Sequence, residues 1–203
     1  MQLNQSRTGQ LAYVLAGGQS SRFGQNKALV SIQGETHLTR LANQLLCDGF
    51  EVAIVSQMEQ DYSKFGFRQI FDHEPNSGPL AGVIAALTDC KRQSRPHCWL
   101  VTCDLLDWRR EWFGILEGSR QISSGAEPKV AIFESAEFLP FPGRYCVSIL
   151  DVAMESWAAG NRSIRGLHKL LESYVVQVPV SPDLVPRSFN TVGELAKLQA
   201  KAE

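Results

Sequence analysis

Residues 11–27 read LAYVLAGGQSSRFGQNK, a short apolar run followed at once by a glycine-rich loop. The apolar run is typical of a buried parallel strand. A glycine-rich loop that leaves such a strand can bring backbone N–H groups close to a phosphate, because no Cβ stands in the way. Arg22 and Lys27 add positive charge to the same loop. We therefore expect residues 15–27 to bind a triphosphate.

The spacing of this loop excludes two common phosphate-binding motifs. A Walker A loop needs Gly, Lys and Ser or Thr in direct succession, whereas two residues separate Gly24 from Lys27. A dinucleotide fingerprint needs G-x-G-x-x-G, whereas Gly17 and Gly18 are adjacent. The alternative is a glycine-rich surface turn with solvated basic residues, which would suit a lone pair of glycines better than it suits the whole of residues 15–27.

Length and composition predict one globular domain that spans residues 1–203. The chain is 44% hydrophobic and 20% charged, with a formal net charge of -1, so its total charge favours neither nucleic acid nor an anionic membrane as a partner. Residues 1–10 lack the apolar region of a signal peptide, and no apolar run approaches the length of a membrane span. We therefore expect a cytoplasmic protein in which local charge handles any phosphate.

The five cysteines are scattered along the chain, at positions 47, 90, 98, 103 and 146. None forms a C-x-x-C pair, and no His or Cys cluster has the spacing of zinc ligands. An odd, scattered set fits reduced thiols in a cytosolic protein, and we expect these residues to be small core side chains.

Apolar runs alternate with helical patterns in the first hundred residues, which predicts strand–helix–strand units and a parallel sheet. Further strands are expected at 52–55, 68–71, 99–102, 129–133 and 174–178. Helices are expected from a Thr36 cap to Gly49, from Pro79 to Cys90, and at 62–65, 108–116, 147–159, 163–171 and 192–200. Prolines make residues 138–144 a loop or an edge segment. The predicted fold class is α/β, in three α/β/α layers with a mostly parallel mixed sheet of Rossmann-like form.

Two carboxylates follow predicted strands. Asp104 comes just after 99–102, where open α/β sheets place their ligands, and a carboxylate there suits Mg²⁺. An equally good interpretation is that Asp104 caps the next turn. Asp72 ends the strand at 68–71, and it is either a ligand or a turn residue that leads toward the next helix. We expect its neighbour His73 to be a surface or loop histidine.

The segment after Asp72 suits an anionic ligand. Gly78 permits close backbone approach, and Pro79 begins a helix whose N-terminus carries positive potential.

Four segments together resemble the molybdenum cofactor guanylyltransferase family over nearly the whole chain. Residues 15–27 match L-A-G-G-x-S-x-R-x-G-x-x-K, residues 78–82 match G-P-L-A-G, residues 160–167 are similar to G-x-R-S-[LV]-x-x-L, and residues 188–195 look like N-[IV]-N-T-P-E-E-L. The paired glycines of the first loop are typical of guanylyltransferases, whereas the related cytidylyltransferases tend to have Ala-Gly.

The chain departs from the family pattern at three places. Leu105-Leu106 stands where Met-Pro or Thr-Pro is usual after the Cys-Asp pair. Ser188 and Val192 replace an asparagine and a proline of the last motif.

The resemblance implies a nucleotidyltransferase that transfers GMP from GTP to molybdenum-bound molybdopterin and releases pyrophosphate. Arg22, Lys27 and Asp104 would be catalytic, the two basic side chains by countering charge on the phosphates. Mg²⁺ would be the cofactor, with Asp104 and Asn190 as its protein ligands. The residues that would bind the nucleotide are Leu15, Ala16, Gly17, Gly18, Lys27, Ser56, Asp72, Gly78, Pro79, Leu80 and Asp104. Among these, Ser56 stands where the family often has an asparagine near the base.

Some roles stay open at this stage. Asn190 either faces the metal or caps the last helix, and Thr191 would serve equally well as that cap. Arg162 and Arg165 either meet the acceptor's phosphate or are solvated charges on a capped helix. No nucleic acid or membrane partner is expected, only transient contact with other proteins of molybdenum cofactor biosynthesis. The rival interpretations are a cytidylyltransferase or sugar-phosphate nucleotidyltransferase, and a nucleotide-binding protein without activity.

Overall fold

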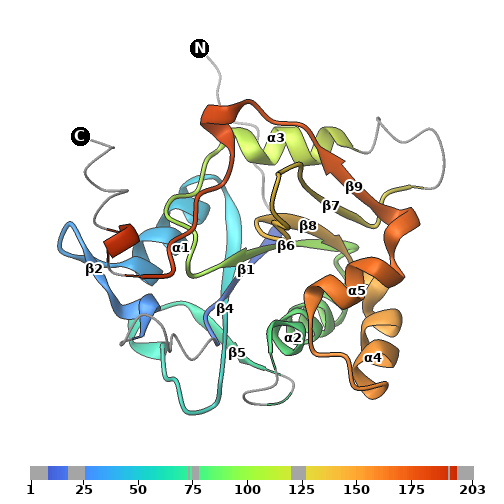
Figure 1. Cartoon of the computed structure of the whole chain (residues 1–203). Helices are drawn as coiled ribbons and strands as arrows, with labels where there is room; N and C mark the ends of the chain where they lie inside the picture. Colours follow the sequence, from blue (N-terminus) through green and yellow to red (C-terminus); the bar gives the residue numbers. More distant parts are fainter. Residues whose placement is uncertain are drawn as a thin grey trace.

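A seven-stranded sheet runs through the centre of the molecule (Figure 1). In spatial order its strands are β5 (Arg68–Phe71), β4 (Phe50–Ser56), β1 (Gln10–Leu15), β6 (His97–Thr102), β8 (Gly143–Cys146), β7 (Val130–Phe133) and β9 (Val175–Val178). A separate hairpin pairs β2 (Ser31–Ile32) with β3 (Glu35–Thr36). This computed structural model describes residues 9–17, 26–72, 74, 78–119, 127–191 and 193–195.

Within the described sheet, β8 alone runs against its neighbours. It is antiparallel to β6 and to β7, whereas the pairs β1–β4, β1–β6, β4–β5 and β7–β9 are all parallel. The mostly parallel mixed sheet that the sequence predicts is therefore confirmed. The apolar run of β1 is buried because helices cover both faces of a parallel sheet.

The prediction of a loop or edge segment over residues 138–144 is wrong at its C-terminal end. Gly143 and Arg144 belong to β8, which lies between β6 and β7 rather than at an edge. Both prolines of the segment precede the strand, so neither removes a hydrogen bond from its ladder. Glycine is required at 143 because a β-carbon would lie 2.9 Å from the carbonyl oxygen of Pro140.

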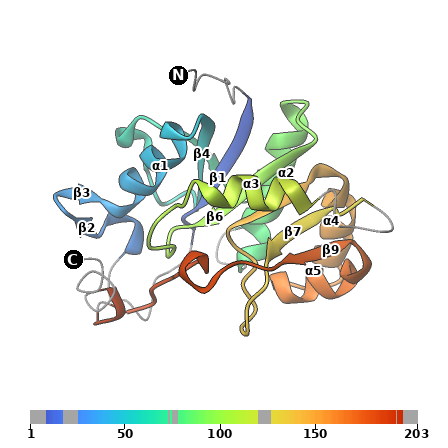
Figure 2. The same cartoon turned by 90° about the horizontal axis from the view of Figure 1, so that it is seen from above.

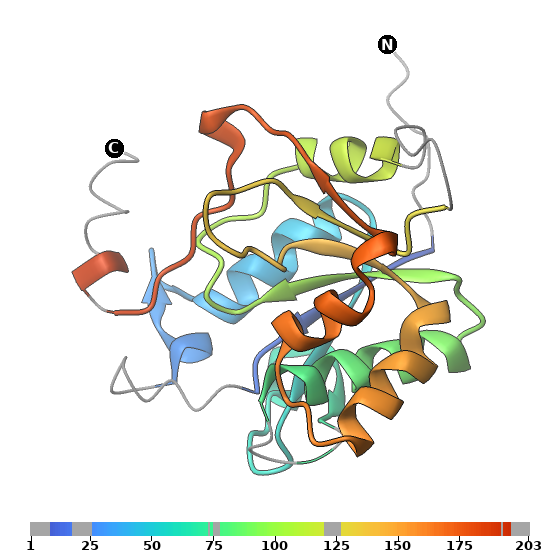
Figure 3. The same cartoon turned by 45° about the vertical axis from the view of Figure 1, so that its right-hand side comes forward.

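Helices cover both faces of the sheet, as Figure 3 shows. They are α1 (His37–Cys47), α2 (Pro79–Arg92), α3 (Glu111–Gly118), α4 (Leu150–Ala158) and α5 (Ile164–Leu170). In β1, Ala12 and Val14 pack into the core with α1 and α3, whereas Leu11 and Tyr13 pack into the core with α2, α4 and α5. This alternation along one strand is what divides the molecule into three layers.

Helix starts follow the capping chemistry that the sequence predicts. The Thr36 hydroxyl accepts from the backbone N–H of Thr39 at 3.3 Å, and Pro79 occupies the first turn of α2. Trp108, expected within a helix, precedes α3 and packs into the core instead. Among the described residues, no helix is long and apolar enough to cross a membrane.

The cysteines only partly meet their prediction. All five are free thiols, and Cys90 and Cys98 are buried. Cys47, at the C-terminal end of α1, is exposed, so the expectation of a core side chain is wrong there.

The sheet changes its direction of winding beside β1. The chain goes from β1 to β4 on one side and later returns to β6 on the other, so the loops after β1 and β6 diverge from one edge. Open α/β sheets bind their ligands at such a point. The segment that follows β9 crosses the molecule to reach this region (Figure 2). A small buried cluster fixes it there, formed by Ile32, Leu106, Phe189 and Leu195.

Candidate active site

Three strand ends bring the predicted residues to one edge of the sheet. The parallel ladders continue one residue beyond the strands, because the N–H groups of Ala16, Asp72 and Cys103 donate to the carbonyls of Val55, Ser56 and Leu15, at 2.7, 2.8 and 3.1 Å. The loops after β1, β5 and β6 therefore leave the sheet in fixed register.

The first of these loops touches Asp72 directly. A β-carbon on Gly17 would lie 2.5 Å from Asp72 Oδ2, and one on Gly82 would lie 3.4 Å from Oδ1. The carboxylate thus packs against two glycines, one from each of two predicted nucleotide-binding segments. Burial raises the pKa of Asp72 to about 6, because the ionised form loses solvation there.

The start of α2 packs against the turn between α4 and α5. Gly78 has φ +85°, and a β-carbon on it would lie 2.8 Å from the carbonyl oxygen of Arg162. Next to it, Pro79 is exposed and Leu80 is buried. Glycine at 78 is therefore required both by its backbone conformation and by this close approach.

The two arginines of the α5 segment are held against aromatic rings. The Arg162 guanidinium lies 3.8 Å from the ring centre of Trp157, and it donates to the Trp157 carbonyl at 2.7 Å. The Arg165 guanidinium lies 4.5 Å from the ring centre of Phe138. The structure therefore places both side chains on ring faces, which neither of their two predicted roles anticipates.

Lys27 is turned inward toward the C-terminal segment. Its side chain is only 9% exposed, and its Nζ donates to the carbonyl of Phe189 at 3.2 Å and to Asn190 Oδ1 at 2.9 Å. Lys27 lies in η1 (Lys27–Leu29), which Asn26 caps by accepting from the N–H of Ala28 at 3.0 Å. The last residue of the loop motif is thus joined to the late motif of the chain.

Asp104 stands on a short antiparallel bridge. Its backbone carbonyl accepts from the N–H of Phe189 at 2.9 Å, and the N–H of Leu106 donates to the carbonyl of Arg187 at 2.8 Å. These two bonds flank the bridged pair Leu105 and Ser188. The bridge fixes the strand end that carries Asp104 beside the segment that carries Asn190.

The Asp104 side chain does not cap the next turn. Its Oδ1 accepts from the hydroxyl of Thr102, on the preceding strand, at 2.6 Å. The next helix, α3, begins at Glu111 without a side-chain cap. Of the two interpretations that the sequence left open, the structure therefore does not support the cap.

Thr191, rather than Asn190, caps the helix that contains residues 193–195. The Thr191 hydroxyl accepts from the N–H of Glu194 at 3.1 Å, and the Glu194 carboxylate accepts from the N–H groups of Asn190 and Thr191 at 2.6 and 3.2 Å. This is a capping box, and it leaves the amide of Asn190 available to Lys27.

Ser56 is buried beneath the surface of this edge. Its hydroxyl donates to the carbonyls of Gln57 and Gln60, at 3.2 and 3.3 Å, and accepts from Gln69 Nε2 at 2.6 Å. The side chain therefore holds the turn after β4. Four residues named from the sequence, Gly18, Arg22, Gly24 and His73, lie outside the described residues.

The donor set at the bridge fits a magnesium ion that is shared with a phosphate. Among the described residues, no group of three or more His, Cys, Asp or Glu side chains could hold a metal ion. Mg²⁺ does not need one, because it takes one or two protein oxygens together with waters and substrate phosphates. The Asp104 carboxylate and the Asn190 amide supply hard oxygen donors on two joined segments.

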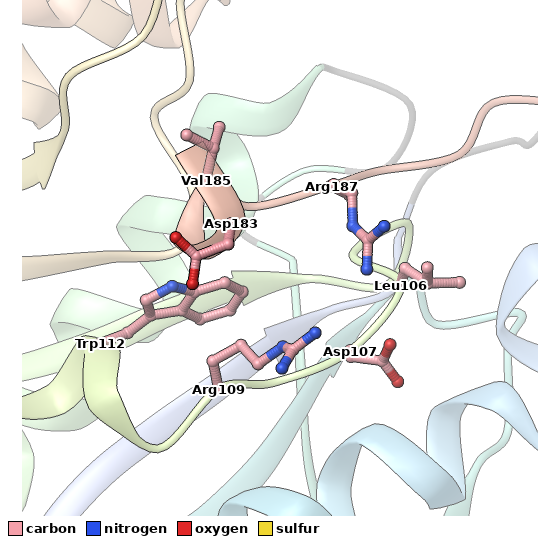
Figure 4. Close-up of a pocket in the computed structure, with 7 residues that line it drawn as sticks. All are labelled: Leu106, Asp107, Arg109, Trp112, Asp183, Val185 and Arg187. Carbon is pink, nitrogen blue, oxygen red and sulfur yellow. The ribbon is translucent and has the colours of Figure 1, made fainter. Parts of the chain in front are cut away.

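A small, shallow pocket adjoins the same bridge (Figure 4). The side chains of Arg109 and Arg187 point into it from the two joined segments. Its lining is Leu106, Asp107, Arg109, Trp112, Asp183, Val185 and Arg187. None of these is a predicted nucleotide contact, so this pocket is distinct from the site at the sheet edge.

The fold closely matches that of a solved structure from molybdopterin-guanine dinucleotide biosynthesis. The crystal structure of molybdopterin-guanine dinucleotide biosynthesis protein A from Archaeoglobus fulgidus matches with a TM-score of 0.76 and 20% identity, over 94% of this chain and 97% of that one. At that identity the likeness shows the fold alone.

Comparisons of sequence place the chain more closely. Residues 12–176 match the family described as the MobA-like NTP transferase domain. The molybdenum cofactor guanylyltransferase of Rhizobium meliloti (strain 1021) is 33% identical over 200 residues, which cover 93% of this chain and 90% of that one. The probable molybdenum cofactor guanylyltransferase of Opitutus terrae is 32% identical over 153 residues, 75% of this chain and 74% of that one. The chain therefore belongs to the MobA-like NTP transferase family and is a nucleotidyltransferase.

Proposed function

We propose that this protein transfers GMP from GTP to molybdenum-bound molybdopterin, giving the guanine dinucleotide form of the cofactor and pyrophosphate. One observation carries the proposal. Lys27, Asp104 and Asn190, which lie far apart in the chain, meet at the end of β6 through two hydrogen bonds and the bridge. The relatives named as guanylyltransferases support the choice of GTP and molybdopterin.

The nucleotide would lie across the edge of the sheet. The backbone of Leu15, Ala16, Gly17 and Gly18 would face its phosphates, with charge from Arg22 and Lys27. Asp72 would accept a hydrogen bond from the ribose, since its carboxylate is held between two glycines and no partner for it is described. Gly78, Pro79 and Leu80 would border the base at the start of α2. Ser56 would act through the turn that it holds.

Asp104 and Asn190 would hold Mg²⁺ together with phosphate oxygens. When bound, the ion supplies positive charge that offsets the charge of the phosphates. The Thr102 hydroxyl would keep the Asp104 carboxylate oriented, because it already donates to Oδ1.

The chemistry needs little proton transfer. An oxygen of the acceptor's terminal phosphate would attack the α-phosphorus of GTP, and the bond from that phosphorus to the bridging oxygen of the β-phosphate would break, so that pyrophosphate leaves. The attacking group is already an anion at neutral pH. Lys27 and Arg22 would stabilise the charge that grows on the leaving phosphates.

Residues 1–203 would form one working unit, because a single sheet extends from residue 10 to residue 178. Five free cysteines suit a reducing compartment such as the cytoplasm. Transient contact with other proteins of molybdenum cofactor biosynthesis would deliver the acceptor.

A nucleotide panel tests the choice of base. GTP, ATP and CTP are titrated into the protein with Mg²⁺, and pyrophosphate release is then measured with molybdopterin present. A pocket that accepts the N1–H and N2 amine of guanine leaves polar groups unpaired when adenine enters, at a cost of about 1–3 kcal/mol each. We expect GTP to bind at least about tenfold more tightly than the others. Equal affinities or a preference for CTP would instead support a cytidylyltransferase, and GTP binding without turnover would indicate an inactive nucleotide-binding protein.

A further inference from the structure

His37 is a buried side chain whose ring nitrogens make no hydrogen bond of good geometry. It is the first residue of α1, its side chain is 0% exposed, and its backbone N–H donates to the carbonyl of Val30 at 2.8 Å. Among the described residues, neither Nδ1 nor Nε2 of its ring has a hydrogen-bond partner. Unpaired polar groups in a core cost stability, and an apolar side chain would fill this space without that cost. A histidine here therefore needs an explanation beyond packing.

The ring lies next to the bridge that carries Asp104. It meets the ring of Phe189 edge-on, with centroids 5.0 Å apart and planes at 65°. Burial lowers the pKa of His37, and a hydrogen-bonding interaction with the backbone of Leu105 is the strongest effect that opposes this shift. The charged neighbours are Arg40, which lowers the pKa, and Asp107 and Asp104, which raise it. The neutral imidazole therefore faces the backbone of Leu105.

The backbone of Leu105 has an acceptor to offer. In the bridge, the hydrogen bonds run through the neighbours of Leu105 and Ser188, so the carbonyl of Leu105 points away from the facing strand. Its hydrogen-bonding neighbour is the His37 ring. The ring N–H and this carbonyl thus lie close enough to interact, in a geometry short of a full hydrogen bond.

Three segments that carry proposed site residues meet around this ring. The β2–β3 hairpin lies between η1, which contains Lys27, and His37. The N–H of His37 donates to the Val30 carbonyl, so the two ends of this hairpin lie side by side. Leu105 follows Asp104, and Phe189 precedes Asn190. The ring therefore lies beside the backbone segments that carry Asp104 and Asn190, at the end of the hairpin that follows Lys27.

We propose that His37 is a positioning residue for nucleotidyl transfer: its ring N–H completes its hydrogen bond to the Leu105 carbonyl when substrates bind, and so sets Asp104 against Lys27 and Asn190. The proposal rests on the proposed function, because it assumes that Asp104 works on the phosphates. It assigns the polar ring a task that leucine could not perform and that glutamine, with its amide N–H, could perform in part.

Two variants and a control test it. His37→Leu removes the donor, His37→Gln keeps one, and Trp99→Phe removes another buried N–H without a described partner, on strand β6. Thermal unfolding, GTP affinity, the Mg²⁺ concentration for half-maximal GTP binding, and the kcat of pyrophosphate release are measured on each. Trp99→Phe should leave kcat and the Mg²⁺ dependence within about twofold of the wild type.

For His37→Leu we expect a Tm equal to the wild-type value or higher, GTP affinity at saturating Mg²⁺ within about twofold, and kcat lower by about tenfold or more. The Mg²⁺ requirement should rise by at least about threefold, and His37→Gln should recover much of both losses. Wild-type kcat and Mg²⁺ dependence in His37→Leu would overturn the proposal. So would losses that His37→Gln fails to restore, or losses that follow a fall in Tm of more than about 3 °C, because these indicate packing alone.

This result is separable from the proposed function. A wild-type protein that binds and turns over another nucleotide contradicts the choice of GTP, and the same His37 measurements are then made with the nucleotide that it uses. A wild-type protein whose nucleotide binding does not depend on Mg²⁺ contradicts both.

Discussion

The Asp72 carboxylate rests on the α-carbon of Gly17, so closely that a β-carbon there would lie 2.5 Å from Oδ2. The contact joins the loop after β1 to the end of β5, although the two residues lie far apart in the sequence. It leaves no room for a β-carbon at position 17. Both the shape and the charge of this part of the site depend on it.

Gly17→Ala should therefore destabilise the fold and weaken nucleotide binding. Overpacking of this kind costs about 1–3 kcal/mol, because the new methyl and the carboxylate cannot both keep their places. Chemical unfolding measures the change. Gly114→Ala is the matched control, since nothing lies within 4 Å of a β-carbon at that helical position and alanine should be neutral or stabilising there. If Gly17→Ala costs nothing, or costs as much with Asp72→Ala as without it, the contact is not the cause.

Asp72→Asn should stabilise the protein at neutral pH. The pKa of Asp72 is raised from 3.8 to about 6 by burial, so the folded state binds the proton more tightly than the unfolded state. The ionised carboxylate therefore costs stability above about pH 6, and that cost disappears below the unfolded pKa near 4. For a partly exposed group we expect a gain of about 1–2 kcal/mol at pH 7.

Unfolding of wild type and Asp72→Asn at pH 7 and pH 4 checks this sign. The difference should be large at pH 7 and near zero at pH 4, while Glu155→Gln, an exposed change on α4, should show little difference at either pH. A gain of the same size at both values would mean that the carboxylate's charge is not responsible.

Ionisation of Asp72 should have the opposite effect on nucleotide affinity: it lowers the stability of the fold but strengthens GTP binding. The ionised form accepts a hydrogen bond from a ribose hydroxyl, so GTP binding should weaken by roughly tenfold between pH 7 and pH 5 as Asp72 takes up a proton. Calorimetric titrations at several pH values measure it. In Asp72→Asn the affinity should be lower and should lose this pH dependence, and a dependence that persists in the variant would assign the titration to another group.

The sequence predicts the parts of this fold that local chemistry decides. The run at residues 11–15 is apolar enough to be a buried parallel strand, and Thr36 and Pro79 begin their helices by side-chain and ring chemistry that needs no distant partner. Strand β8 escaped prediction because its place between β6 and β7 depends on the packing of Gly143 and Tyr145, not on a local pattern.

The site shows the same division. Motif spacing identified Lys27 and Asn190 separately, but nothing local to either indicates that one donates to the other. The sequence predicted that Ser56 binds the nucleotide, and only Gln69 on the next strand shows that its hydroxyl is occupied. His37 carried no signal at all, because its position under the bridge comes from the fold of the C-terminal segment.

Asp104→Asn should remove Mg²⁺-dependent transfer while preserving the fold. The amide keeps the shape and can still meet Thr102, but it lacks the charge that favours a divalent cation. We expect pyrophosphate release to fall by about a hundredfold or more, with Tm within about 3 °C of the wild type. Asp107→Asn is the matched control. Asp107 lies on the same loop as Asp104, but its carboxylate pairs with Arg40 of α1 at 2.5 Å. Normal Mg²⁺ dependence in Asp104→Asn would exclude Asp104 as a metal ligand.

The pairing of Lys27 with Asn190 gives the sharpest test of the site. Lys27→Met keeps most of the buried stem and removes the charge, so GTP affinity and turnover should fall about tenfold to a hundredfold, as expected for a charged hydrogen bond worth about 1.5–3 kcal/mol. Asn190→Ala should cost less, because Lys27 keeps its bond to the Phe189 carbonyl. Lys91→Met, an exposed change in the last turn of α2, is the control and should alter neither quantity.

The double variant decides whether the two residues act together. If Asn190 acts on GTP affinity mainly by orienting Lys27, then Asn190→Ala should add little once Lys27 is methionine, and the combined loss should fall short of the product of the two single losses. GTP titrations of all four proteins at saturating Mg²⁺ supply the cycle. Single losses that multiply in the double variant would show that Asn190 contributes independently, through the metal rather than through Lys27. Unchanged GTP affinity in Lys27→Met would remove Lys27 from the nucleotide site altogether.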